Sequence, residues 1–115
     1  DARALQEANE RGEITGCIIS GPLALDNAVS AEAARHKGVE GPVAGNADIL
    51  LMPDLAAGNI FTKSLTFYAK MTSAGTLLGT SSAVIAASRT DTPENKYYAI
   101  LIALLSSLQE EQICL

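Results

Sequence analysis

Hydrophobic and polar positions along the chain follow two periods in turn, which predicts strands alternating with helices. Four apolar runs have the length of strands: residues 14–20, 48–52, 76–78 and 83–87. Three intervening segments are rich in helix formers: residues 2–10, 29–37 and 60–71. Because strands alternate with helices, the pattern predicts an α/β protein with a mainly parallel sheet in a three-layer arrangement.

The clearest helix start lies near the end of the chain. Thr92 can cap a helix, Pro93 suits its first position, and Glu94 favours the positive end of the helix. The helix that follows has an apolar stripe wide enough to bury one face: Tyr97, Leu101, Leu104, Leu105 and Leu108. We expect that face to pack against other parts of the protein.

Capping residues mark the limits of the other helices. Asp26 and Ser30 are both competent caps for the Ala-rich helix at 29–37, and Gly38 is placed to end it. Gly12 is a plausible stop for the first helix, and Asn59 can cap the helix at 60–71.

Composition and charge restrict the class of protein. The chain has 115 residues, 48% of them hydrophobic, with a net charge of −5. These values fit one compact domain or a piece of a larger one, and they exclude a disordered chain. A net negative charge argues against a general nucleic-acid binder.

The longest apolar stretch, 99–105, is far shorter than the ~20 residues that span a bilayer. Since the chain begins with Asp1 and not Met, we expect an excerpt from a longer protein.

The possible metal ligands are too few for a metal site. Two cysteines, Cys17 and Cys114, make neither a disulfide framework nor a zinc site, which favours reduced thiols and a cytoplasmic protein. Glu32 and His36 have the spacing of a ligand pair but lack a third ligand nearby. We expect no metal, and we expect His36 to interact with the last carbonyls of its helix.

Three polar segments follow the predicted strands. They span residues 20–26, 53–63 and 88–91. In open α/β sheets, ligands bind beyond the carboxyl ends of the strands, where loops lead into helices. Parallel strands would bring all three segments to the same edge of the sheet, and this convergence indicates a binding site.

The third of these segments suits an oxyanion. Arg89 offers a planar fork for two phosphate oxygens, Ser88 offers a hydroxyl, and the next helix begins with unpaired N–H groups. The alternative is that Arg89 pairs with Asp91 or Glu94 while Ser88 only ends a strand. Spacing by itself leaves both readings open.

The second segment is equally ambiguous. Gly58 permits close backbone approach, and Lys63 lies one helical turn beyond Asn59, within reach of an anion at the helix start. The alternative is a capped helix with Lys63 in solvent. Asp54 after Pro53 is typical of a turn.

Three strings resemble the carboxyl-terminal part of the phosphate acetyl/butyryltransferase family. They are GPLALDNAVSAEAA, VAGNADILLMPDLAAGNIFTKSL and SRTD, in that order. The first string looks closest to the butyryltransferases. The resemblance implies an enzyme that moves a short-chain acyl group, most readily butyryl, between coenzyme A and inorganic phosphate to give acyl phosphate, with no further cofactor.

The resemblance also implies an architecture and a site. Family members have two α/β domains of the isocitrate/isopropylmalate dehydrogenase-like type, so residues 1–82 would belong to the second, inserted domain, and residues 83–115 would be a returning strand and helix of the first. Catalytic roles are implied for Ser88 and Arg89. Substrate-binding roles are implied for Asn46, Asp54, Gly58, Asn59 and Lys63. Acetyltransferases have an aspartate seven residues after the serine, where this chain has Asn95.

Two other functions compete with this interpretation. The first is a phosphate acetyltransferase, and the second is a non-catalytic fragment that mediates self-association. A decarboxylating dehydrogenase would need paired aspartates four residues apart on a helix, a pattern absent from the sequence. We expect acyl-CoA and inorganic phosphate as partners, a homo-oligomer, and little turnover by these 115 residues without the rest of the enzyme.

Overall fold

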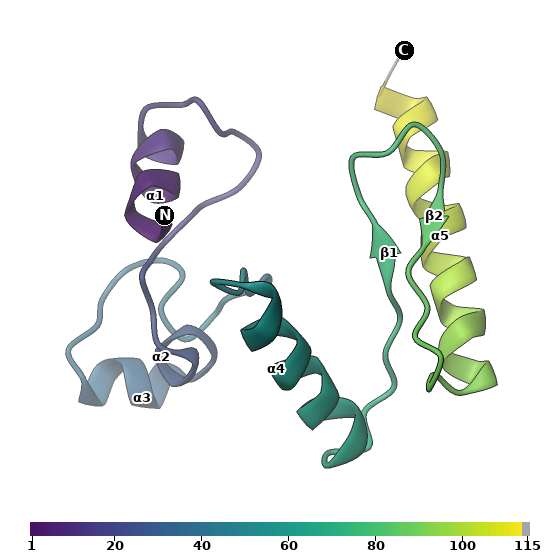
Figure 1. Cartoon of the computed structure of the whole chain (residues 1–115). Helices are drawn as coiled ribbons and strands as arrows, with labels where there is room; N and C mark the ends of the chain where they lie inside the picture. Colours follow the sequence, from purple (N-terminus) through teal and green to yellow (C-terminus); the bar gives the residue numbers. More distant parts are fainter. Residues whose placement is uncertain (114–115) are drawn as a thin grey trace. The chain divides into compact units, whose positions relative to one another are not determined.

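The computed structural model describes residues 1–113, with side-chain surroundings up to Leu108. The chain divides into two compact units, Asp1–Met52 and Pro53–Leu115. The first unit holds three helices: α1 (Ala2–Glu10), α2 (Leu25–Val29) and α3 (Ala31–His36). The second holds α4 (Leu55–Phe67), β1 (Thr76–Leu77), β2 (Val84–Ile85) and α5 (Pro93–Ile113) (Figure 1).

The segment after α1 is irregular and bonded to that helix. The Asn9 side chain donates Nδ2–H to the carbonyl oxygens of Ile14 at 2.9 Å and Cys17 at 3.0 Å, and its Oδ1 accepts from the Ile19 amide at 3.0 Å. The predicted strand at 14–20 is therefore wrong. An apolar run becomes a strand only beside another strand, and a side chain of α1 satisfies this backbone instead.

Helix α3 begins and ends where the capping residues predict. Ser30 Oγ accepts a hydrogen bond from the Ala33 amide at 3.2 Å, and Gly38 follows the helix with φ of +64°. Asp26 is not a cap of this helix, because it lies in the first turn of α2. Its carboxylate accepts from Lys37 Nζ at 2.6 Å, and this bond holds the pKa of Asp26 below its ordinary value.

The loop after α3 returns to α2 through a tight contact. The Gly45 amide donates to the Asn27 carbonyl at 2.7 Å, and the Ala47 amide donates to the Ala28 carbonyl at 3.0 Å. Gly45 has φ of +78°, in the left-handed region that favours glycine. A Cβ at this position would collide with the backbone of Ala31, so glycine is required here for space as well as for conformation.

The second predicted strand of this unit is also wrong. Residues 48–52 form no strand, and Ile49 and Leu51 are 85% and 78% exposed. Apolar side chains in a buried strand need a neighbouring strand and a covering layer. The described residues supply neither to this segment.

The second unit contains a two-stranded hairpin. Strands β1 and β2 are antiparallel, with Thr76 opposite Ile85 and Leu77 opposite Val84. The predicted parallel arrangement is wrong for this pair, because the connection at 78–83 is shorter than the dozen or so residues that a parallel crossover needs. The described residues therefore form a two-stranded antiparallel sheet and not the predicted three layers.

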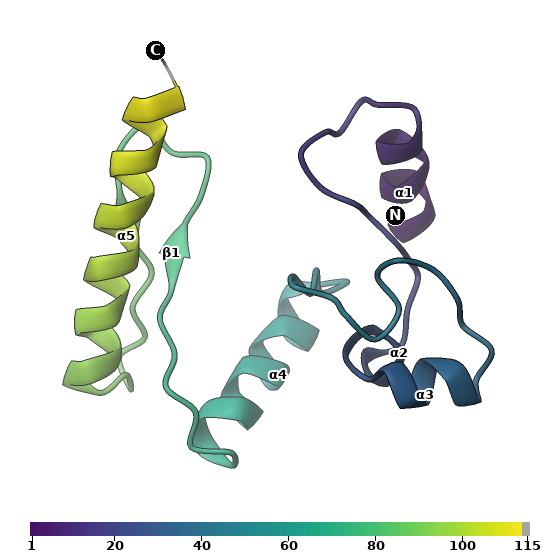
Figure 2. The same cartoon turned by 180° about the vertical axis from the view of Figure 1, so that it is seen from behind.

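Helix α5 packs on the hairpin with small residues. It contacts both β1 and β2, beside which it runs in Figures 1 and 2. Ala99 and Ala103, one helical turn apart, are only 2% exposed, whereas Leu105 is 62% exposed. Where the structure describes side chains, the large apolar stripe is thus exposed, and its expected packing against other parts of the protein stays a prediction. The alanines allow the hairpin backbone to approach closely, and the exposed residues of the predicted stripe are Tyr97, Leu101, Leu104, Leu105 and Leu108.

Helix α4 begins more than one turn before its predicted start. The Asp54 carboxylate accepts a hydrogen bond from the Ala57 amide at 2.8 Å, which makes Asp54 the N-cap. Gly58 and Asn59 consequently lie inside the helix, so the prediction that Asn59 caps it is wrong. The helix ends at Phe67, shortly before Lys70, whose φ is +54°.

Candidate functional site

The loop between β2 and α5 is closed by reciprocal hydrogen bonds. The Ser88 amide donates to Asp91 Oδ2 at 2.6 Å, and the Asp91 amide donates to the Ser88 carbonyl at 3.1 Å. Both bonds span only three residues, so they form a tight turn ahead of the helix. This turn determines where the half-buried Ser88 side chain lies.

The start of α5 is the one that the sequence predicts. Pro93 is its first residue, and Thr92 Oγ1 accepts a hydrogen bond from the Asn95 amide at 3.1 Å. The positive end of this long helix therefore lies immediately after the Ser88–Asp91 turn. An anion near the turn would gain from that partial charge.

Lys63 of α4 reaches the same turn. Its Nζ donates to Ser88 Oγ at 3.3 Å, across 25 positions of sequence, and lies 5.8 Å from the centroid of the Phe67 ring. The structure thus brings together Lys63 and Ser88, which come from the second and third polar segments. The alternative in which Lys63 points into solvent does not hold, because the side chain is half-buried in this contact.

Two cations near this turn have no carboxylate partner. Where the structure describes side chains, neither Lys63 nor Arg89 lies within 4 Å of a carboxylate oxygen. The alternative pairing of Arg89 is not observed, because Asp91 accepts from the Ser88 amide and Glu94 accepts from the Tyr98 hydroxyl at 3.2 Å. The exposed guanidinium of Arg89 is therefore available to an anion from outside.

The other predicted substrate-binding residues have different surroundings. Asp54 caps α4, and Gly58 and Asn59 lie within its first turns. Asn46 belongs to the first unit, where its Nδ2 donates to the Ala44 carbonyl at 3.3 Å. Of the seven predicted site residues, Ser88 and Lys63 are joined by a hydrogen bond.

Asn95 has a structural contact that sequence reasoning missed. Its Oδ1 accepts from the Ser73 amide, and its Nδ2 donates to Ser73 Oγ, both at 3.3 Å. The side chain therefore connects the first turns of α5 to the segment that precedes β1. No sequence signal pointed to this pair, because the two residues are 22 positions apart.

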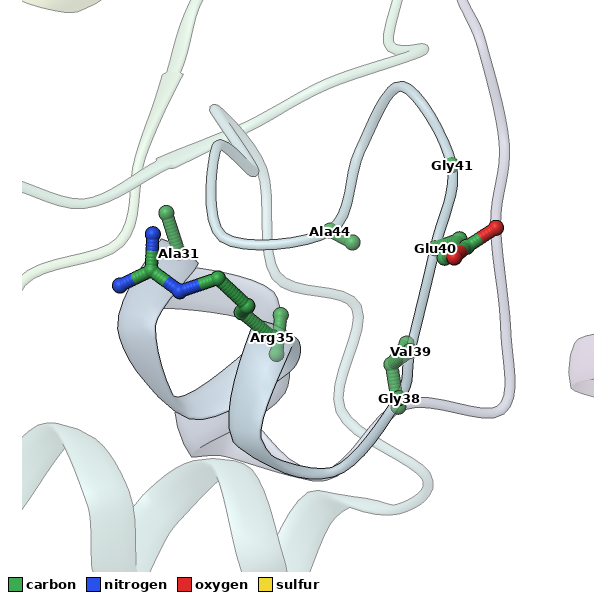
Figure 3. Close-up of a pocket in the computed structure, with 8 residues that line it drawn as sticks. Ala31, Arg35, Gly38, Val39, Glu40, Gly41 and Ala44 are labelled. Carbon is green, nitrogen blue, oxygen red and sulfur yellow. The ribbon is translucent and has the colours of Figure 1, made fainter.

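A shallow hollow of about 300 Å³ lies in the first unit, beside α3 (Figure 3). Figure 3 shows the Arg35 side chain along α3 and Glu40 on the facing loop. The hollow contains none of the predicted site residues, and its lining is formed by Ala31, Ala34, Arg35, Gly38, Val39, Glu40, Gly41 and Ala44.

The described residues show neither a cluster of metal ligands nor a helix suited to a membrane. Within the described residues, no three His, Cys, Asp or Glu side chains lie close enough together to hold a metal ion. Cys17 is an exposed free thiol, while Cys114 lies outside the described residues. Of the described helices, none combines the length and the apolar character that a membrane crossing requires.

The chain is similar to phosphate acyltransferases along most of its length. The family model of phosphate acetyl/butaryl transferases matches residues 2–104. The chain is 52% identical over 103 residues to a phosphate acetyltransferase of Thermotoga maritima and 52% identical over 105 residues to a phosphate butyryltransferase of Clostridium beijerinckii. These matches cover 90% and 91% of this chain and 35% of each relative.

A solved structure extends the similarity to the fold. A branched-chain phosphotransacylase from Enterococcus faecalis V583 matches with a TM-score of 0.76 and 36% sequence identity, over 90% of this chain and 37% of that protein. The chain thus has the α/β fold of part of a phosphotransacylase. It belongs to the phosphate acetyl/butaryl transferase family, and it spans about a third of the length of the relatives it matches.

Proposed function

We propose that the chain is the carboxyl-terminal part of an enzyme that transfers a short-chain acyl group between coenzyme A and inorganic phosphate. The observation that carries the proposal is the turn before α5. There, the Ser88 hydroxyl is bonded to Lys63, the Arg89 guanidinium has no carboxylate partner in the described part, and a helix begins nearby. Together these groups provide donors and positive charge for a tetrahedral dianion.

The reaction places specific demands on these groups. A phosphate oxygen attacks the thioester carbonyl carbon, the carbon–sulfur bond of the resulting tetrahedral intermediate breaks, and coenzyme A leaves as a thiolate. The proton that hydrogen phosphate loses in becoming acyl phosphate passes through water to this thiolate. Arg89 holds two phosphate oxygens, and Ser88 donates to the carbonyl oxygen as it becomes negative. Positioning and such donors each lower a barrier by several kcal/mol, typically about 3–4 kcal/mol for one oxyanion donor.

We propose that no cofactor takes part besides the coenzyme A thioester, which is a substrate. The phosphate nucleophile is already an anion at neutral pH, and side-chain cations supply the compensating charge. Asn95 stands where acetyltransferases have an aspartate, and its bonds to Ser73 give it a structural task. We therefore propose that a carboxylate base at this position is not required.

We propose that butyryl is the preferred acyl group. The basis is the butyryltransferase-like string GPLALDNAVS. The relatives in Thermotoga maritima and Clostridium beijerinckii, named for acetyl and butyryl transfer, are equally similar to this chain. Acetyl transfer is accordingly the competing activity that the assay must separate.

The proposal includes the rest of the enzyme. Residues 1–82 would belong to the second domain of a dehydrogenase-like pair with a three-layer parallel sheet, and residues 83–115 to the first. Strands from the rest of the enzyme would pair with the exposed apolar segment at 48–52. We propose a cytoplasmic enzyme whose site is completed by residues outside this chain, so that these 115 residues by themselves turn over little.

Acyl-chain preference is tested on the full-length protein that contains this segment. We expect phosphate-dependent thiol release to be faster from butyryl-CoA than from acetyl-CoA or a branched acyl-CoA. Double-reciprocal plots against phosphate should intersect, because both substrates are bound when the acyl group moves. Parallel lines would indicate an acyl-enzyme, and absence of phosphate-dependent release would contradict the proposed function.

The exposed apolar residues of α5 favour self-association as a second property. Ile100, Leu101, Leu104, Leu105 and Leu108 are all at least one-third exposed, and they form a continuous apolar surface on one helix. We propose that a second copy of the chain covers this surface.

Light scattering on the 115-residue chain tests the association. We expect the mass of a dimer or a larger assembly, and a lower mass for Leu105→Gln. Ile49→Gln is the matched control, since Ile49 is an exposed apolar residue of the other unit, and it should leave the mass unchanged. A monomeric wild-type chain at working concentration would refute the association.

A further inference from the structure

The Ser88 hydroxyl has an unusual set of neighbours. A serine hydroxyl has one proton to donate and two lone pairs that accept. Lys63 Nζ, at 3.3 Å, is a donor without acceptor capacity, and so is the Thr90 amide, which donates to Ser88 Oγ at 3.4 Å. Both lone pairs of Ser88 Oγ are therefore used.

The proton of this hydroxyl must consequently point to an acceptor. Thr90 Oγ1, 3.1 Å from Ser88 Oγ, is the acceptor within the chain. In an isolated pair, either hydroxyl could donate the hydrogen bond. Here Ser88 is the donor, because its two lone pairs already accept from Lys63 and the Thr90 amide. A substrate oxygen that displaces Thr90 Oγ1 would receive the same proton.

We propose that Lys63 is a positioning residue that acts through Ser88 and makes its hydroxyl an obligate hydrogen-bond donor to the reacting oxygen. The inference rests on the proposed function and assigns to Lys63 a role other than direct phosphate binding. A donor at Ser88 Oγ also polarises the hydroxyl, because hydrogen bonds in a chain strengthen one another.

Lys63 is held in place for this role. Its helix is capped by Asp54, its Nζ lies 5.8 Å from the Phe67 ring centroid, and where side chains are described no carboxylate lies within 4 Å to draw it away. A cation over an aromatic face is attracted by the negative face of the ring. The ammonium group is thus held near the Ser88 hydroxyl by contacts on its own helix.

The same geometry argues against Ser88 as a nucleophile. A nucleophilic serine gives its proton to an adjacent base. The carboxylate of Asp91 accepts a hydrogen bond from the Ser88 amide and not from its hydroxyl. A donor role for Ser88 therefore agrees with direct attack by phosphate.

The test is a double-mutant cycle in the full-length protein, with butyryl-CoA and orthophosphate as substrates. We expect Lys63→Met to lower kcat by about tenfold while the KM for phosphate changes less than about twofold. In a Ser88→Ala background, the same substitution should lower kcat by less than about twofold, because its target is gone. Lys63→Arg should restore part of the loss. Lys96→Met, which removes a lysine of α5, controls for the change in net charge and should leave kcat unaltered.

The alternatives give different results. If Lys63 binds phosphate directly, Lys63→Met raises the KM for phosphate. The loss of activity is then the same in the Ser88→Ala background as in the wild type, and the inference is overturned. If Lys63 only stabilises the fold, its loss lowers the thermal midpoint and the two substitutions are additive, which also overturns it. A wild-type protein without phosphate-dependent thiol release would overturn the proposed function first, so the two failures are distinguishable.

Discussion

Arg89→Ala is expected to lower kcat/KM for orthophosphate by roughly 10²–10³-fold in the full-length enzyme. The guanidinium can hold two phosphate oxygens at once, and in the described part of the chain no carboxylate competes for it. Its loss removes two charge-assisted hydrogen bonds from the nucleophile and leaves the acyl-CoA part of the site intact. Initial rates at varied phosphate and saturating butyryl-CoA measure the effect.

Two control variants give this prediction its specificity. Arg89→Lys keeps the charge but not the planar fork, so it should recover only part of the lost activity. Arg35→Ala removes an exposed arginine of α3 and should leave the rate within about twofold of the wild type. Equal losses for the Arg35 and Arg89 variants would mean that general charge, and not the turn before α5, attracts phosphate.

Gly45→Ala is expected to destabilise the first unit by about 3 kcal/mol. The new Cβ would meet the backbone N and Cα of Ala31 and lie 2.8 Å from the Ser30 carbonyl carbon, atoms that cannot move without displacing the start of α3. The residue would also occupy φ of +78°, which costs a non-glycine residue about 1 kcal/mol. Hydrogen exchange of α2 and α3 amides in the 115-residue chain reports this loss directly.

Gly38→Ala separates the two causes. Gly38 has φ of +64°, but a Cβ there would meet nothing within 4 Å. This variant should therefore lose only the conformational part, about 1 kcal/mol. If both variants accelerated hydrogen exchange to the same extent, the result would contradict a steric contribution from the close approach of Gly45 to Ala31.

Local capping chemistry made the helices largely predictable. Ser30 and Thr92 each accept an amide three residues on, as their positions before helical sequence predict. The predicted start of α4 is too late because it takes Asn59 as the cap, whereas Asn59 lies inside the helix. Asp54, three residues before the amide it accepts, was the better signal.

Interactions between distant segments were harder to predict. The runs at 14–20 and 48–52 have strand composition, but a strand also needs a partner, which the described residues do not provide. Helix α5 is apolar on most sides, so its sequence could not show that Ala99 and Ala103 would face the hairpin. The sequence predicts that the polar segments containing Lys63 and Ser88 lie near each other beyond the strand ends. It does not predict the hydrogen bond between the two side chains.

Isothermal titration of orthophosphate into the full-length protein tests most directly whether the turn before α5 recognises a tetrahedral anion. We expect a saturable heat for the wild type and its loss in Arg89→Ala, with butyryl-CoA binding retained in both proteins. A phosphate isotherm that is the same in both proteins would contradict it.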